Sequence, residues 1–221
     1  MSIPTIDLMN QKFILELNAA LAMENAGVER LQTRITEASL PEAKQRLEYH
    51  LQESLQHQKI LEQLISSIGG QPTQEKLGLP LPSYPTAMKE MMDKTMTKQE
   101  YELKRAEEDM IVENAEVCVY LMLIQKCQMA GGTYLNAIAP LSKNMNDEQE
   151  QADWLKTHSP AMLAQLWPKI LSSIVGKVIH ETASDVGSKI TEGAKVMRSN
   201  ITKGAKDLGE TIDKELQDLA K

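Results

Sequence analysis

Residues 14–35 read ILELNAALAMENAGVERLQTRI and carry apolar side chains at alternating steps of three and four residues. This spacing places Ile14, Leu21 and Val28 on one face of an α-helix, the face that packs into a bundle core. Glu24 lies in the middle of that face. An ionised carboxylate buried there without a partner costs at least several kcal/mol. The stretch therefore predicts a core helix with a charge that something must neutralise.

Three later stretches, 50–68, 103–124 and 138–155, predict helices with the same kind of face. In 103–124 and in 138–155 an acidic residue replaces one member of the apolar stripe. In 50–68 an acidic residue lies directly beside a stripe that holds two histidines. The polar candidates on the four core faces are Glu24, His50, Glu53, His57, Glu113, Glu116 and Glu148.

These acidic residues lie in windows of sequence without Lys or Arg, such as the window between Lys12 and Arg30. In an antiparallel bundle the helix centres meet at one level, so the carboxylates are expected to converge. Carboxylates that close together cannot all stay ionised without a cation. Carboxylate oxygens with one or two imidazoles are the ligands of dinuclear iron and manganese sites in helix bundles. The sequence therefore predicts a dinuclear Fe or Mn centre.

The roles within this centre are left partly open by the spacing. Glu24 and Glu148 are expected as terminal or bridging ligands, Glu53 and one of Glu113 or Glu116 as bridges, and His57 or His50 as the nitrogen ligand. Each position also has a plainer interpretation. A single glutamate in a helical stripe is usually half exposed at a bundle edge, and a lone buried histidine is usually hydrogen-bonded within the core.

Three neighbouring features are interpreted without a metal. Tyr120 either donates a hydrogen bond to a carboxylate or simply fills the core. Asp147, Glu150 and Asp153 are expected to form a solvated face of the fourth helix. The methionine-rich stretch Met88–Met96 is expected to fill gaps in packing.

The chain order predicts an all-α, ferritin-like four-helix bundle. Ser39 is expected to cap the second helix, Pro140 to bend the fourth, and Pro160 and Pro168 to break the chain. The predicted elements are a helix from Ser2 or Thr5 to about Ala38, a helix from Ser39 to Ile68, an irregular connection over 71–86, a short helix over Met88–Met96, a helix from Thr97 to Gly131, and a helix from Thr133 to His158. The long connection between the second and third major helices allows a crossover, as in ferritin-like folds.

A different pattern begins after residue 168, so residues 1–168 are predicted to form the bundle and 169–221 an amphipathic helical tail. From Val175 onward the apolar residues follow steps of 4, 4 and 3, which is an eleven-residue repeat. A period of 3.67 residues per turn keeps the apolar stripe straight, or favours a right-handed supercoil. The tail carries several glycines, so it is expected to need a partner surface.

Composition limits the classes of function. The net charge of −7 argues against a nucleic-acid binder. Cys118 and Cys127 lie on one predicted helix, roughly 13 Å apart, which is too far for a disulfide. The N-terminus lacks the pattern of a signal peptide, and no segment is long and apolar enough for a membrane span. We therefore expect a cytoplasmic protein.

Three segments resemble the YciF/YciE-type ferritin-like stress proteins of bacteria: AMENAGVERL at 22–31, HLQESLQHQKILEQLISSIGG at 50–70 and VENAEVCVYL at 112–121. The resemblance extends over about residues 8–165. It implies a ferritin-like bundle, a dinuclear metal site, frequent dimerisation and a role in stress. The fourth helix departs from the Glu-x-x-His of ferritins, since Gln151 stands three residues after Glu148.

Two hypotheses follow for function. In the first, the protein is a non-haem di-iron or di-manganese protein whose metals react with peroxide or dioxygen, in a ferroxidase-like or catalase-like reaction. In the second, it is a non-catalytic interaction protein that uses residues 171–221 to bind a membrane surface or a partner protein, with the bundle as scaffold. A homodimer is expected in either case.

Overall fold

The computed structural model describes residues 5–219, which form helices and the connections between them without a β-strand in that range. The elements are α1 (Thr5–Glu37), α2 (Pro41–Ser67), α3 (Thr86–Thr95), α4 (Lys98–Ala130), the 3₁₀ helix η1 (Gly132–Ala137) and α5 (Ile138–Leu219). The chain divides into two compact units, the first ending at Lys169 and the second beginning at Ile170.

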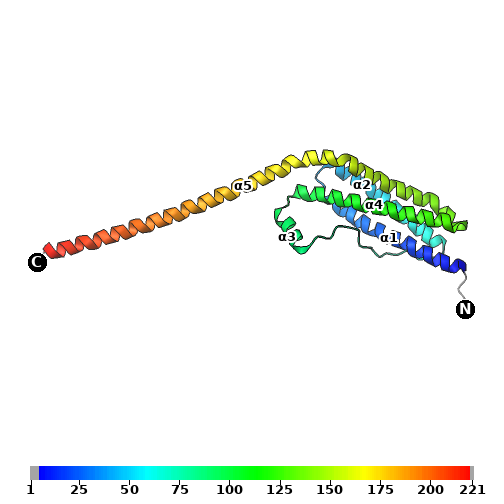
Figure 1. The fold of residues 1–221 in the computed structure, drawn as a ribbon, viewed down its shortest axis with the longest axis horizontal. Helices are drawn as coiled ribbons and strands as arrows, with labels where there is room; N and C mark the ends of the chain where they lie inside the picture. Colours follow the sequence, from blue (N-terminus) through cyan, green and yellow to red (C-terminus); the bar gives the residue numbers. More distant parts are fainter. Residues whose placement is uncertain (1–4, 220–221) are drawn as a thin grey trace. The chain divides into compact units, whose positions relative to one another are not determined.

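The first unit is a bundle of α1, α2, α4 and the part of α5 before Ile170 (Figure 1). A short connection makes α1 and α2 antiparallel, and η1 connects α4 to an antiparallel α5. Between α2 and α4 the chain returns along the bundle, so that these two helices run in the same direction. This crossover confirms the predicted ferritin-like topology.

The crossover is held against α1 by two asparagines. The Asn18 side chain accepts a hydrogen bond from the Thr73 N–H at 2.8 Å, and the Asn25 amide donates to the Glu75 carbonyl at 2.9 Å. The N–H of Leu77 donates to the carbonyl of Ala22 at 3.0 Å. These contacts cover the stretch of α1 around Glu24, so the connection closes the bundle beside the predicted site.

Two apolar clusters fill the bundle, and along the sequences of α2, α4 and α5 a polar level lies between them. The first cluster contains Phe13, Leu17, Ala20, Leu21, Leu61, Ile65, Tyr120, Leu123, Ile124, Cys127 and Leu141. The second contains Leu40, Ala43, Ala106, Met162 and Leu166. Because water is excluded on both sides, charged groups at the intermediate level must be neutralised by one another or by bound ions.

The ends of the helices agree with the sequence in one case and correct it in another. Thr97 caps α4 in a capping box. The backbone N–H of Glu100 donates to the Thr97 hydroxyl, and the Glu100 carboxylate accepts a hydrogen bond from the backbone N–H of Thr97. At α2 the N-cap residue is Leu40, so the prediction that Ser39 caps this helix is wrong. Ser39 instead donates its N–H and hydroxyl to the buried carboxylate of Glu102 on α4.

The predicted effects of the prolines are also corrected. α5 begins at Ile138, so Pro140 lies in the first turn. Backbone N–H groups in the first turn have no acceptor within the helix, so the N–H that proline lacks is not needed there. The helix continues through Pro160 and Pro168, where breaks were expected. Met162 and Leu166 are buried in the second apolar cluster. Their burial offsets the hydrogen bond that Pro160 removes from the helix.

The second unit, residues 170–221, is helical as far as Leu219. Its side chains between 174 and 200 are all exposed. The sequence of this unit contains five glycines, and each costs about 1 kcal/mol relative to alanine inside a helix. Within residues 5–219, no helix combines the length and the apolar character that crossing a membrane would require.

A buried ion-pair network connects α1 to α4 near the second apolar cluster. Arg30 and Arg34 each donate from Nε to one oxygen of Asp109, both at 2.8 Å, and Asp109 is 3% exposed. Removing the charge of Asp109 would leave two guanidinium groups without their common partner.

We predict that Asp109→Asn lowers the free energy of unfolding by about 3–5 kcal/mol, the usual cost of breaking a buried ion pair. Urea unfolding followed by circular dichroism measures this. The control is Asp153→Asn, an exposed position on α5, where a change within about 0.5 kcal/mol is expected. Equal effects of the two substitutions would contradict the structural role of Asp109.

Candidate metal centre

Six ionisable side chains from all four helices of the bundle meet between the two apolar clusters. Each is at most 5% exposed. They are Glu24 of α1, His50 and His57 of α2, Glu113 and Glu116 of α4, and Glu148 of α5. The convergence predicted from the sequence is therefore observed.

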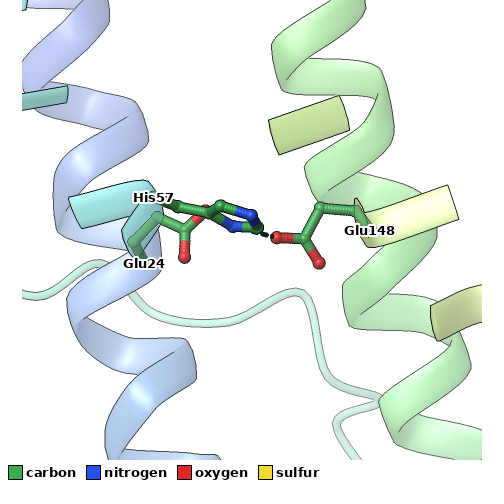
Figure 2. Close-up of side chains that lie close together, drawn as sticks. All are labelled: Glu24, His57 and Glu148. Atoms are coloured by element: carbon green, nitrogen blue, oxygen red, sulfur yellow. Dashed lines mark ion pairs between the residues drawn. The ribbon is translucent and has the colours of Figure 1, made fainter. Parts of the chain in front are cut away.

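The first group joins α1, α2 and α5. His57 places Nδ1 at 2.7 Å from Oε1 of Glu148 and at 3.2 Å from Oε1 of Glu24. Figure 2 shows the imidazole between the two carboxylates. The three side chains offer one nitrogen and two oxygens, all within 4.8 Å of one another, and can hold a metal ion.

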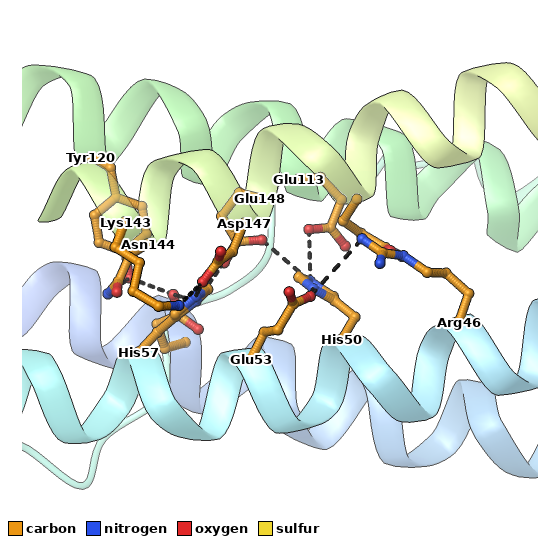
Figure 3. A network of polar contacts seen from close by, with 12 residues as sticks. Arg46, His50, Glu53, His57, Glu113, Tyr120, Lys143, Asn144, Asp147 and Glu148 are labelled. Carbon is orange, nitrogen blue, oxygen red and sulfur yellow. Dashed lines mark hydrogen bonds and ion pairs between the residues drawn. The ribbon is translucent and has the colours of Figure 1, made fainter. Parts of the chain in front are cut away.

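The second group joins α2, α4 and α5. His50 places Nε2 at 3.0 Å from Oε2 of Glu113 and at 3.2 Å from Oε2 of Glu148 (Figure 3). These three side chains also offer one nitrogen and two oxygens within 4.8 Å. Glu148 belongs to both groups and turns one carboxylate oxygen toward each histidine, which is the geometry of a bridging carboxylate.

Glu116 completes the acidic set. Its Oε1 is buried and has no hydrogen-bond partner among the described residues. A Cβ on Gly27 of α1 would lie 3.3 Å from this oxygen, so the glycine leaves room for the carboxylate. Both oxygens of Glu148 and Nδ1 of His57 also lack a hydrogen bond of good geometry, despite their close neighbours. Buried lone pairs without donors fit a set of atoms arranged around cations.

The outer nitrogen of each histidine contacts a second carboxylate. Nδ1 of His50 lies 3.1 Å from Oε2 of Glu53, and Nε2 of His57 lies 3.1 Å from Oδ2 of Asp147. Such contacts fix the tautomer and the orientation of a metal-binding imidazole. Asp147 was expected on a solvated face, and this was wrong, because Asp147 adjoins Glu148 in sequence and packs against His57.

Like Glu116, Glu53 is a predicted ligand that lies outside both groups. It contacts His50 from the side away from Glu113, and NH2 of Arg46 lies 3.9 Å from its Oε2. Glu53 lies in a window of sequence without Lys or Arg, between Arg46 and Lys59. Arg46, seven residues earlier on the same face of α2, nevertheless reaches it. Arg46 also donates from Nε to Gln151 at 2.6 Å.

Tyr120 and Asn144 position Glu24. The Tyr120 hydroxyl donates to Oε1 of Glu24, and the Asn144 amide donates to the Tyr120 oxygen at 3.1 Å. Tyr120 thus donates a hydrogen bond to a carboxylate and also fills the core, since its ring belongs to the first apolar cluster. Asn144 and Gln151 are fully buried, and neither is among the residues predicted for the site, although Gln151 is noted as a departure from the ferritin motif. Their spacing of four and three residues from Glu148 on one helical face was the available signal.

Burial and crowding shift the pKa values of the site in opposite directions. Burial, with the nearby Glu148, raises the pKa of Glu24 and Glu116, and burial raises that of Glu113 to about 8. Burial alone would raise the pKa of Glu148, but the two imidazoles hold it well below its usual range. Without metal, the fold therefore keeps protons on several of these carboxyl groups.

The histidines hold protons as well. Burial alone would lower the pKa of His57, but Glu148 and Glu24 raise it to about 10. Glu113 and Glu148 likewise keep the pKa of His50 well above its usual value. A metal-free site thus stores positive charge as protons on the same nitrogens that a metal ion would need.

We predict that metal binding at pH 7 releases about two or more protons per chain, because both imidazoles must become neutral to act as ligands. Titration calorimetry of Mn²⁺ in buffers of different ionisation enthalpy measures this number. The apparent affinity should then rise about 100-fold for each unit of pH near neutrality. Release of less than about one proton would show that the histidines do not bind the ion.

We also predict that Glu53→Gln and Asp147→Asn each weaken Mn²⁺ binding by about 10- to 100-fold without changing the number of ions bound, as is typical of carboxylates that orient a ligand. Equilibrium dialysis with metal analysis distinguishes affinity from stoichiometry. Exposed Glu48→Gln and Asp153→Asn serve as matched controls. Loss of a whole ion from the Glu53 variant would make Glu53 a ligand.

Comparisons with known proteins show the fold and the family. A crystal structure of a Xanthomonas campestris protein is similar at 18% identity with a TM-score of 0.58, covering 73% of this chain and 97% of that one. YcfI from Rhodopseudomonas palustris is similar at 20% identity with a TM-score of 0.56, covering 71% of this chain and 98% of that one. No curated protein sequence matches significantly. Residues 9–166 match the family described as a domain of unknown function, DUF892, and the chain belongs to that family.

Proposed function

We propose that this chain is a ferritin-like, non-haem protein with a dinuclear iron or manganese centre that reacts with peroxide or dioxygen. The observation that carries the proposal is the position of Glu148, which is shared by two groups of one imidazole and two carboxylates. In this proposal Glu24 and His57 hold one ion, Glu113 and His50 hold the other, and Glu148 bridges them. Glu116, whose buried Oε1 has no hydrogen-bond partner among the described residues, supplies a further carboxylate beside the two groups.

Charge balance supports two divalent ions in the site. Glu24, Glu113, Glu116 and Glu148 carry four negative charges when ionised, and two divalent cations neutralise all four. The ligand types narrow the choice of metal. Calcium and magnesium prefer sites made of oxygen alone, and structural zinc prefers closed tetrahedral sites rich in cysteine. Mixed carboxylate and imidazole ligands in a helix bundle are typical of iron and manganese.

When bound, the two ions would supply the change in oxidation state needed for peroxide or dioxygen chemistry. The side chains of the chain control access and geometry. Burial of all six ionisable groups excludes bulky substrates, which favours an oxidant as small as dioxygen or hydrogen peroxide. Tyr120 holds Glu24, while Glu53 and Asp147 hold the two imidazoles. This rigid arrangement presents preformed ligands.

A role in oxidative or general stress fits this chemistry. It is supported by the resemblance of residues 22–31, 50–70 and 112–121 to YciF/YciE-type stress proteins. Two reactions remain alternatives within the proposal. A ferroxidase-like reaction oxidises Fe(II) and reduces dioxygen or peroxide, and a catalase-like reaction converts two molecules of hydrogen peroxide into dioxygen and two of water.

The stoichiometry of metal binding tests the proposal. We predict about two ions per chain after anaerobic reconstitution with Fe²⁺ or Mn²⁺, as a two-metal site requires. Glu24→Gln and Glu113→Gln should each lose about one ion, whereas Glu148→Gln should lose both, because only Glu148 contacts both groups. Inductively coupled plasma mass spectrometry on folded variants, with circular dichroism to verify folding, gives the counts.

The control for these variants is Glu48→Gln, which makes the same substitution on the exposed face of α2 and should keep both ions. Wild-type protein that binds no iron or manganese would contradict the proposal. An oxygen electrode then separates the reactions. Evolution of dioxygen from peroxide identifies the catalase-like reaction, and consumption of dioxygen as Fe²⁺ is oxidised identifies the ferroxidase-like one.

A further inference from the structure

Each imidazole of the candidate centre has a cation behind its outer carboxylate, but the two cations differ in exposure. The side chain of Arg46 is 11% exposed, and that of Lys143 is 56% exposed. We propose that Arg46 weakens the His50 position of the dinuclear centre, so that one ion is held firmly at His57 while the ion at His50 exchanges. This inference rests on the proposed function, because both positions must bind a divalent ion.

Arg46 is fixed beside the second group by several contacts. It lies one helical turn before His50 on α2, and its Nη2 is 3.9 Å from the Glu53 carboxylate that contacts His50 (Figure 3). Its Nε donates to the fully buried Gln151 of α5 at 2.6 Å, and its guanidinium lies 5.0 Å from the centroid of the Tyr49 ring. The guanidinium therefore stays at the edge of the second group.

The charge of Arg46 is permanent and opposes a cation at His50. A guanidinium stays protonated at every pH at which proteins fold. Its Nη2 is buried and has no hydrogen-bond partner among the described residues. Its acidic neighbours are Glu150, which is 68% exposed, and Glu53, whose negative charge would otherwise attract the ion. In these buried surroundings water screens charge weakly, so Arg46 offsets the attraction of Glu53 for a divalent ion.

The cation behind His57 opposes an ion much less. Lys143 contacts Asp147, whose carboxylate lies 3.1 Å from Nε2 of His57. The Lys143 side chain extends into solvent, where water and salt screen its charge. Arg46 is also more distant from this position, because His57 lies about 16 Å from it along the axis of α2, whereas His50 lies only about 6 Å away. The first group thus keeps more of the negative charge that attracts a cation.

Variants that keep one position each test the proposal without any change at Arg46. Glu113→Gln removes a ligand of the second group and keeps the His57 position, and Glu24→Gln removes a ligand of the first group and keeps the His50 position. Titration calorimetry with Mn²⁺ should give an affinity at least about tenfold higher for Glu113→Gln than for Glu24→Gln. Equal affinities, or the reverse order, would overturn this proposal alone. Wild-type protein that binds no Mn²⁺ would contradict the proposed function as well.

Removal of the charge at Arg46 then assigns the cause. In the Glu24→Gln background, Arg46→Gln should raise the Mn²⁺ affinity about tenfold, whereas Arg46→Lys keeps the charge and should change the affinity less than about threefold. The matched control is Lys143→Gln in the Glu113→Gln background, which removes one exposed charge and should also change the affinity less than about threefold. Circular dichroism verifies the folding of each variant. No gain from Arg46→Gln, or an equal gain from Lys143→Gln, would overturn the proposal.

Discussion

Four carboxylates in the buried centre of a helix bundle impose one constraint on the whole first unit: their charge must be neutralised where they lie. The six ionisable groups of this level are at most 5% exposed, and apolar clusters close it on both sides. Among the described residues, the groups of this level that can carry positive charge are the imidazoles of His50 and His57. Those imidazoles can carry two positive charges as protonated groups, or they can serve as neutral ligands to cations.

Neighbouring side chains hold the two imidazoles and Glu24 in fixed positions. The carboxylates of Glu53 and Asp147 hold the outer nitrogens of His50 and His57, so each ring keeps one nitrogen directed inward. Tyr120 and Asn144 fix the position of Glu24. The ferritin-like crossover along α1 closes the bundle beside the same level. The bundle thus presents two groups of side chains that can each hold a metal ion and that share Glu148.

Sequence periodicity was sufficient to predict the bundle and the convergence of Glu24, Glu113 and Glu148, because buried polar residues interrupt apolar stripes visibly. The crossover was predicted from the long connection over residues 71–86. Periodicity could not predict contacts that depend on side-chain direction. Asp147 lies one residue from Glu148 and was placed in solvent, yet its carboxylate reaches the outer nitrogen of His57. Arg46 reaches Glu53 across seven residues. Pro160 does not break α5, because the packing of Met162 and Leu166 outweighs the tendency of proline to interrupt a helix.

The most direct test of the central claim is anomalous X-ray diffraction from crystals of the manganese-loaded protein, collected on both sides of the manganese edge. We expect two anomalous peaks about 3.5–4 Å apart, one beside His57 and Glu24 and one beside His50 and Glu113, with the Glu148 carboxylate between them. A single peak, or peaks at exposed carboxylates with none beside the six buried groups, would contradict a dinuclear centre in this bundle.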